Sequence, residues 1–296
     1  MGRAKEKIDL EIELLQEKQK FLKYEGLDRI ISSHEKSEEL KQLLEADKLN
    51  PKILSKIPAL DELLEGFRIG TVNIVSGPTG EGKTTWTQTL TRSFSSQGIN
   101  SVWFSFEVMP AEFFSKFGQN VPLFFLPKEI PENSNNVIWL RNRILESQAK
   151  FNTKIVFIDH LHYLQDMQGL SGKDNASLYI GDLIRKLKRL SINLEIAIFL
   201  VVHVKTDAGN QAEIKKYFTK DDIRDSSFVK QEADTVMMIW RKRKKADNEV
   251  GWEYSNSAIL NLDKHRRTGK VGFVKLTHQD HQFHELIEES YTNSYG

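Results

Sequence analysis

One stretch of the sequence decides the fold: Gly77-Pro78-Thr79-Gly80-Glu81-Gly82-Lys83-Thr84. All of its fixed positions match the phosphate-binding loop pattern G-x-x-x-x-G-K-[ST]. The run before it, Gly70–Ser76, reads as a short β-branched strand. The run after it, Trp86–Phe94, reads as a helix because it contains neither Pro nor Gly. A strand, a loop and a helix in this order predict a P-loop nucleotide-binding core of the α/β class.

The residue types in this loop suit a nucleoside triphosphate. Glycines let backbone N–H groups turn toward phosphate oxygens where a Cβ would clash, and the helix start adds partial positive charge. We expect Lys83 to reach the β- and γ-phosphates and the Thr84 hydroxyl to ligate Mg²⁺. The predicted cofactors are therefore ATP, or another nucleoside triphosphate, and Mg²⁺. The predicted phosphate-binding residues are Gly77, Gly80, Gly82, Lys83, Thr84 and Thr85.

The charge balance and the cysteine content exclude several classes of function. The 296 residues include 42 basic and 41 acidic ones, for a net charge of +1, so nucleic-acid binding must come from local patches. The absence of cysteine excludes disulfides, thiolate catalysis and cysteine-based zinc sites. Because no signal peptide or membrane-spanning run is visible, we expect an intracellular location. This is the cytoplasm or nucleoid, or an organelle matrix if a transit peptide was removed.

The chain divides into two regions near Pro51. Residues 1–50 are charged and helix-favouring, with spaced apolar residues from Ile8 to Leu27 and a second short helix expected over Ser37–Leu44. This extension is either a solvated arm or a helix that docks on a neighbouring subunit, and we favour docking. Residues 51–296 form the expected motor domain.

In the second region, apolar β-rich runs alternate with polar helical stretches. This alternation predicts a mostly parallel twisted sheet flanked by helices. The last two runs flank Arg267–Lys270, which predicts a C-terminal β-hairpin. The charged run Arg241–Lys245 reads as a solvated turn, Arg241 excepted. The expected strands are Val72–Ser76, Ser101–Phe106, Ile155–Ile158, Ile196–Val204, Thr235–Trp240, Ala258–Leu262 and Val271–Leu276.

Three expected strands end in polar groups. Asp159 ends an apolar strand, and the carboxyl ends of parallel strands lie next to the nucleotide, so Asp159 is expected to complete the Mg²⁺ shell. Glu107 follows another strand and is placed to polarise an attacking water, although a helix cap explains such an acid equally well. His203 ends a third strand and is expected beside the γ-phosphate rather than as a core histidine.

The order of these motifs resembles the RecA-like motor of DnaB-family replicative helicases. It runs from the phosphate loop through Glu107, Asp159 and His203 to the segments Gln231–Asp234 and Lys264–Gly269. Within this family, the Twinkle and phage primase–helicase branch also has His at the strand-end sensor position. The resemblance covers residues 52–286 and implies an ATP-dependent DNA helicase motor.

The resemblance also implies roles for single residues. Glu107 resembles the catalytic glutamate and His203 the γ-phosphate sensor. Arg266, with Lys264 beside it, resembles the finger that completes a neighbour's site, and Arg267 is its adjacent competitor. Two further residues of the nucleotide site are implied by the same resemblance: Gln231 and Arg241.

Two polar segments are candidates for contacts with nucleic acid. Tyr163–Ser177 and Lys205–Lys220 both follow strands that end at the nucleotide, and clustered lysines suit phosphates of a single strand. The implied partners are single-stranded DNA, further copies in a hexameric ring, and primase or other replisome proteins. A RecA- or KaiC-like ATPase and a non-unwinding helicase partner are the alternatives. The expected nucleic-acid contacts are Lys205, Lys215, Lys216 and Arg224.

Overall fold

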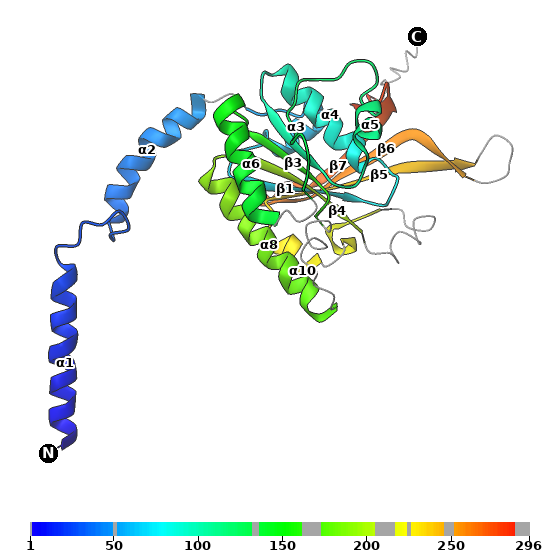
Figure 1. Ribbon diagram of the computed structural model, residues 1–296. Coiled ribbons are helices and arrows are strands. Elements are labelled where there is room, and N and C mark those ends of the chain that lie inside the picture. Colours follow the sequence, from blue (N-terminus) through cyan, green and yellow to red (C-terminus); the bar gives the residue numbers. More distant parts are fainter. Residues whose placement is uncertain are drawn as a thin grey trace, which may run out of the picture. The chain divides into compact units, whose positions relative to one another are not determined.

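The computed structural model describes residues 2–49, 52–131, 136–161, 173–204, 217–223, 226–245 and 252–287 (Figure 1). The chain forms two compact units, Met1–Pro51 and Lys52–Gly296. Among the described residues, no helix is long and apolar enough to cross a membrane.

The first unit consists of two helices, α1 (Gly2–Phe21) and α2 (Ser33–Leu49). The second helix is longer at both ends than the expected Ser37–Leu44. An ion pair of 2.8 Å joins Arg29 to Glu35 near the start of α2. Large apolar side chains of this unit are exposed, among them Ile8, Leu10, Ile12, Leu14, Leu15, Leu40, Leu43 and Leu44.

The second unit is built on one eight-stranded sheet with the order β2-β3-β4-β1-β5-β6-β7-β8. The ladders from β2 to β5 are parallel and the remaining ones antiparallel, which confirms the predicted α/β class and the terminal hairpin of β6 and β7. The strands are β1 (Thr71–Gly77), β2 (Ser101–Ser105), β3 (Ile155–Asp159), β4 (Ala197–His203), β5 (Thr235–Lys245), β6 (Trp252–His265), β7 (Gly272–Gln279) and β8 (Gln282–Glu285).

Helices cover both faces of this sheet. Strand residues alternate between two cores: Ile74 packs in one and Val75 in the other, as expected for a sheet buried on both faces. The first core includes residues of α6 (Asn136–Phe151), α8 (Lys173–Asn193) and α10 (Ser226–Glu232). The second includes residues of α3 (Pro58–Leu64), α4 (Lys83–Ser96) and α5 (Pro110–Ser115).

Two features of the sheet differ from the sequence-based expectation. Arg241–Lys245 is the end of β5 and pairs with β6 out to Trp252, so the expected solvated turn was wrong. In Figure 1 these two strands project from the body as a long ribbon. The second feature is β8, which was not predicted and whose Phe283 is buried beside Trp86 of α4.

Candidate active site

The phosphate loop joins β1 directly to α4, and its three glycines adopt positive φ angles of 153°, 78° and 107° at Gly77, Gly80 and Gly82. A Cβ at Gly77 would overlap the carbonyl oxygen of Ile239 in β5, and one at Gly82 would lie 2.8 Å from a ring carbon of Phe283. Glycine is therefore required here by backbone conformation and by the closeness of β5 and β8.

Lys83 is buried at the first position of α4. Its Nζ donates to the carbonyl oxygens of Gly77, at 3.1 Å, and Pro78, at 3.0 Å. Burial lowers the pKa of Lys83, while the charges of Asp159, Glu107 and Glu81 act in the opposite direction. A bound phosphate would favour the charged ammonium further, so the site suits an anion.

Asp159 and Thr84 meet at the carboxyl end of β3. The Thr84 hydroxyl donates to Asp159 Oδ2 at 2.8 Å. Asp159 Oδ1 is buried and has no hydrogen-bond partner among the residues that the structure describes. Burial raises the pKa of this carboxyl group, and a divalent cation would offset that cost. These oxygens fit the hard-ligand chemistry that Mg²⁺ requires.

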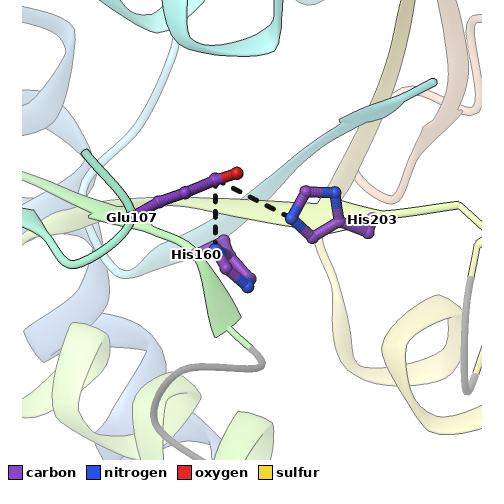
Figure 2. Close-up of side chains that lie close together, drawn as sticks. All are labelled: Glu107, His160 and His203. Atoms are coloured by element: carbon purple, nitrogen blue, oxygen red, sulfur yellow. Dashed lines mark ion pairs between the residues drawn. The ribbon is translucent and has the colours of Figure 1, made fainter. Parts of the chain in front are cut away.

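Glu107 lies with two histidines at the ends of three neighbouring strands (Figure 2). Glu107 Oε2 is 3.2 Å from His160 Nδ1 and 3.8 Å from His203 Nε2. Hydrogen bonding with His160 is the largest effect that lowers the pKa of Glu107 to about 2, with charge on both histidines and Lys83 adding and burial opposing. The three side chains also offer ligand atoms within 4.8 Å of one another, a spacing compatible with a transition-metal ion.

Arg241 lies on the other flank of the phosphate loop. Its guanidinium is 5.3 Å from the ring centroid of Tyr254 and donates to the Ser255 carbonyl at 3.1 and 2.9 Å. The Tyr254 hydroxyl comes within 3.6 Å of where a Cβ of Gly80 would be. Arg241 and Tyr254 therefore lie beside the phosphate loop.

Gln231, Lys264 and Arg266 lie elsewhere, at the amino ends of the parallel strands. Thr235 of β5 pairs with Asn73 and with His265, so Arg266 follows at the opposite end of the sheet from Gly77. Asn73 and Gly77 are four strand residues apart, roughly 13 Å at about 3.3 Å per residue. Within one subunit, these three residues do not join the phosphate loop.

The two candidate finger residues have different partners at this end. Arg266 donates to the Gln231 carbonyl and lies 3.5 Å from Asp234, with 46% of its side chain exposed. Arg267 is 35% exposed, pairs with Glu65 at 3.1 Å and donates to the Leu64 carbonyl at 2.5 Å. Arg266 is thus the less constrained of the two.

Lys264 is held by the same segment as Arg266. Its Nζ donates to the carbonyl oxygens of Lys230 and Gln231, the second at 3.2 Å. Burial is the largest cause of its lowered pKa, and the neighbouring charge of Arg266 adds to it.

The four expected nucleic-acid contacts, Lys205, Lys215, Lys216 and Arg224, lie outside the described residues, as does most of Tyr163–Ser177. Sequence reasoning missed His160 and Tyr254. A signal for His160 was its place directly after the strand-end Asp159. Tyr254 had no such signal, because the pairing of β5 with β6 brings it to the loop.

The parallel sheet, the phosphate loop and the Thr84–Asp159 contact define a P-loop domain of the RecA-like type. Residues 120–285 match the DnaB-like helicase C terminal domain family, which is more than half of the chain, and the chain belongs to this family. The matched residues begin after the phosphate loop, so the loop indicates a nucleotide site independently of the family match.

Curated relatives agree with this family. The replicative DNA helicase DnaB of Rickettsia bellii is 26% identical over 166 residues, covering 50% of this chain and 32% of the relative. That of Helicobacter pylori is 33% identical over 135 residues, covering 45% of this chain and 25% of the relative. The chain spans about a third or less of the length of these relatives.

Solved structures show the same fold. One is a DnaB-like replicative helicase described together with its interactions with primase, with a TM-score of 0.67, 18% identity, and coverage of 88% of this chain and 69% of that one. Another is an isolated ATPase domain, with a TM-score of 0.68, 17% identity, and coverage of 86% and 99%. Both confirm the RecA-like core.

Proposed function

We propose that this chain is the ATP-hydrolysing motor of a ring-shaped replicative DNA helicase that moves along single-stranded DNA. One observation carries the proposal: the phosphate loop, the Thr84–Asp159 pair and Glu107 converge at the carboxyl ends of neighbouring strands. Membership of the DnaB-like family directs this ATPase chemistry toward DNA unwinding.

In this proposal the loop glycines and Lys83 bind the phosphates of ATP. Thr84 and Asp159 would hold Mg²⁺, which neutralises charge on the β- and γ-phosphate oxygens when bound. Glu107 orients the attacking water. A carboxylate with a pKa of about 2 is a weak base, so orienting and polarising the water suits it better than early proton abstraction. His203, 3.8 Å from Glu107, is placed to sense the γ-phosphate.

The far end of the sheet supports a site shared between subunits. Arg266 is too distant to serve the nucleotide of its own chain, so we assign it to the nucleotide of an adjacent copy, where a cation stabilises the transferring phosphoryl group. Gln231 and Lys264 lie beside Arg266, and we assign them to the nucleotide site of the adjacent copy as well. A hexameric ring supplies such neighbours. The further proposed partners are single-stranded DNA and primase or other replisome proteins, and the proposed location is the compartment in which DNA is replicated.

The test compares wild-type protein with Glu107→Gln and with a surface control, Lys186→Ala, whose ion pair with Asp182 lies on α8. Wild type and control should hydrolyse ATP faster with single-stranded DNA present and unwind a forked duplex. Glu107→Gln should bind nucleotide but do neither. Strand exchange without unwinding would instead indicate a recombinase, and no hydrolysis with DNA present would indicate a non-unwinding partner.

A further inference from the structure

His160 is the neighbour of both carboxylates of the site, of Asp159 in sequence and of Glu107 in space. It follows Asp159 directly and precedes Leu161, and both neighbours are fully buried. The backbone on either side of His160 is therefore anchored in the core. The His160 side chain itself is only 16% exposed, whereas that of Glu107 is 40% exposed.

The segment that carries Glu107 is tied to the same strand end. The Phe106 amide donates to the Asp159 carbonyl at 2.7 Å, which continues the β2–β3 ladder by one bond beyond its last pair, Ser105 and Asp159. This bond anchors the backbone directly before Glu107 but leaves the side-chain torsions of Glu107 undetermined. The carboxylate needs a second contact to have one orientation.

His160 supplies that contact. Its Nδ1 lies 3.2 Å from Glu107 Oε2, within ion-pair distance, and its ring lies edge-on to His203 with centroids 4.3 Å apart and planes at 80° (Figure 2). Packing against His203 restricts the imidazole, and the restricted imidazole faces the more exposed carboxylate. The core thus holds the backbone around His160, and the His160 ring in turn restricts the Glu107 carboxylate.

We infer that His160 is a positioning residue that holds the Glu107 carboxylate in the orientation needed to direct water at the γ-phosphate. This inference rests on the proposed catalytic role of Glu107. It also means that one dipeptide, Asp159-His160, sets the positions of both the metal-binding and the water-orienting carboxylates.

Three substitutions separate positioning from packing. His160→Asn keeps a nitrogen donor close to the place of Nδ1, His160→Phe keeps the ring without a donor, and His160→Ala removes both. Because a misplaced catalytic group costs rate rather than affinity, Ala and Phe should lower kcat for ATP by roughly tenfold to a hundredfold with KM within about twofold. Asn should recover most of the lost rate.

The pattern of rates across the three variants distinguishes positioning from a merely structural role of the ring. If Phe restores kcat and Asn does not, the ring acts by packing and the inference is overturned. Thermal unfolding of all three variants accompanies the kinetics. If His160→Ala fails to fold, the comparison of His160→Asn with His160→Phe still decides between positioning and packing. The protein is treated with a chelator before Mg²⁺ and ATP are added, so that no transition metal bound by the three side chains affects the rates.

A double-mutant cycle with Glu107→Gln tests whether His160 acts through Glu107. If it does, His160→Phe should have almost no further effect on the residual rate of Glu107→Gln. An equal fold loss in both backgrounds would show that His160 acts independently and would overturn the inference. A Glu107→Gln protein with wild-type rate would overturn the proposed role of Glu107 first, and the inference with it. The two failures are thus distinguishable.

Discussion

At the scale of single residues, the phosphate loop gives the clearest prediction of kinetics. Lys83 is buried, and its ammonium donates to two carbonyl oxygens of the loop. Lys83→Ala should abolish ATP turnover and weaken nucleotide binding, because no other described ammonium takes its place in the loop. Fluorescent-nucleotide titration and a phosphate-release assay measure both effects. Lys186→Ala should behave as wild type, and turnover near wild type in Lys83→Ala would contradict the assignment.

Gly77 and Gly98 allow a matched test of what glycine contributes to the loop. Both have positive φ, but a Cβ at Gly77 would overlap the backbone of Ile239, whereas one at Gly98 meets nothing within 4 Å. Gly98→Ala should cost about 1–2 kcal/mol of left-handed strain. Gly77→Ala should cost roughly 3 kcal/mol or more, because β5 must also move. Urea unfolding midpoints compare them, and equal losses would contradict the overlap argument.

The lowered pKa of Glu107 predicts a specific dependence of the free energy of unfolding on pH. Its pKa falls from the usual 4.5 to about 2 in the folded protein. A lowered pKa stabilises the fold above the unfolded-state value, and this contribution disappears as pH falls from about 4.5 toward 2. The difference in free energy of unfolding between wild type and Glu107→Gln should therefore shrink as the pH falls from about 4.5 toward 2. A difference that stays constant over this acid range would contradict the lowered pKa.

At the scale of elements, the two N-terminal helices contain no buried side chain among the residues whose exposure the structure describes. Apolar side chains such as Ile8, Ile12 and Leu15 of α1 and Leu43 of α2 are exposed. A helix of this kind is stabilised by packing against another surface. We propose that this surface belongs to a neighbouring subunit.

Deletion of residues 1–30 tests this element. Sedimentation velocity should show smaller assemblies, while circular dichroism and nucleotide binding show that the second unit stays folded. As a control, Lys36→Ala removes only an exposed ion pair with Glu39 and should leave the assembly unchanged. Assemblies of undiminished size after the deletion would make the extension a solvated arm.

The elements also show which parts of the fold were predictable from sequence. The seven expected strands all exist, because each contains an apolar run that gives a local signal. β8 was missed because Gln282–Glu285 is short and mostly polar, with Phe283 alone facing the core. The end of β5 was misread because its Arg and Lys residues lie on a ribbon beyond the sheet's buried centre, where strand pairing needs no apolar pattern.

The candidate site was predictable to a similar extent. The loop, Asp159, Glu107 and His203 were found because each lies at the end of a recognisable strand, and strand order brings such ends together. The contact of His160 with Glu107 depends on side-chain packing across three strands, which no periodicity reports. Likewise, Gln231 lies away from the loop because it precedes β5, which begins at the end of the sheet opposite the loop. The order of motifs in the sequence does not reveal this placement.

At the scale of the whole molecule, the phosphate loop and Arg266 lie at opposite ends of the parallel strands. Arg266→Ala should therefore cut ATPase sharply yet leave nucleotide affinity within a few-fold, because the charge that it meets develops mainly in the transition state. Arg267→Ala is the matched comparison. Since Arg267 is paired with Glu65 in its own chain, its loss should affect stability more than turnover.

Mixing experiments then test whether Arg266 acts between subunits. Arg266→Ala and Glu107→Gln proteins are each inactive in this scheme, but a mixed assembly contains some interfaces with an intact finger facing an intact site. ATPase of the mixture should exceed that of either protein alone. No recovery, with co-assembly shown by fluorescence energy transfer, would reject Arg266 and direct attention to Arg267 or Lys264.

The opposite placement of the loop and Arg266 also limits the symmetry of any assembly that completes this site. In a two-fold dimer the same patch of both copies meets itself, so one surface would have to carry both the loop and the finger, and each interface would complete two sites. In a heterologous contact the finger end of one copy meets the loop of the next, and the contact repeats from copy to copy. Such contacts close into a ring or continue as a helical filament. A pair of copies then carries one complete site, and hydrolysis per copy rises with assembly size until the last interface closes.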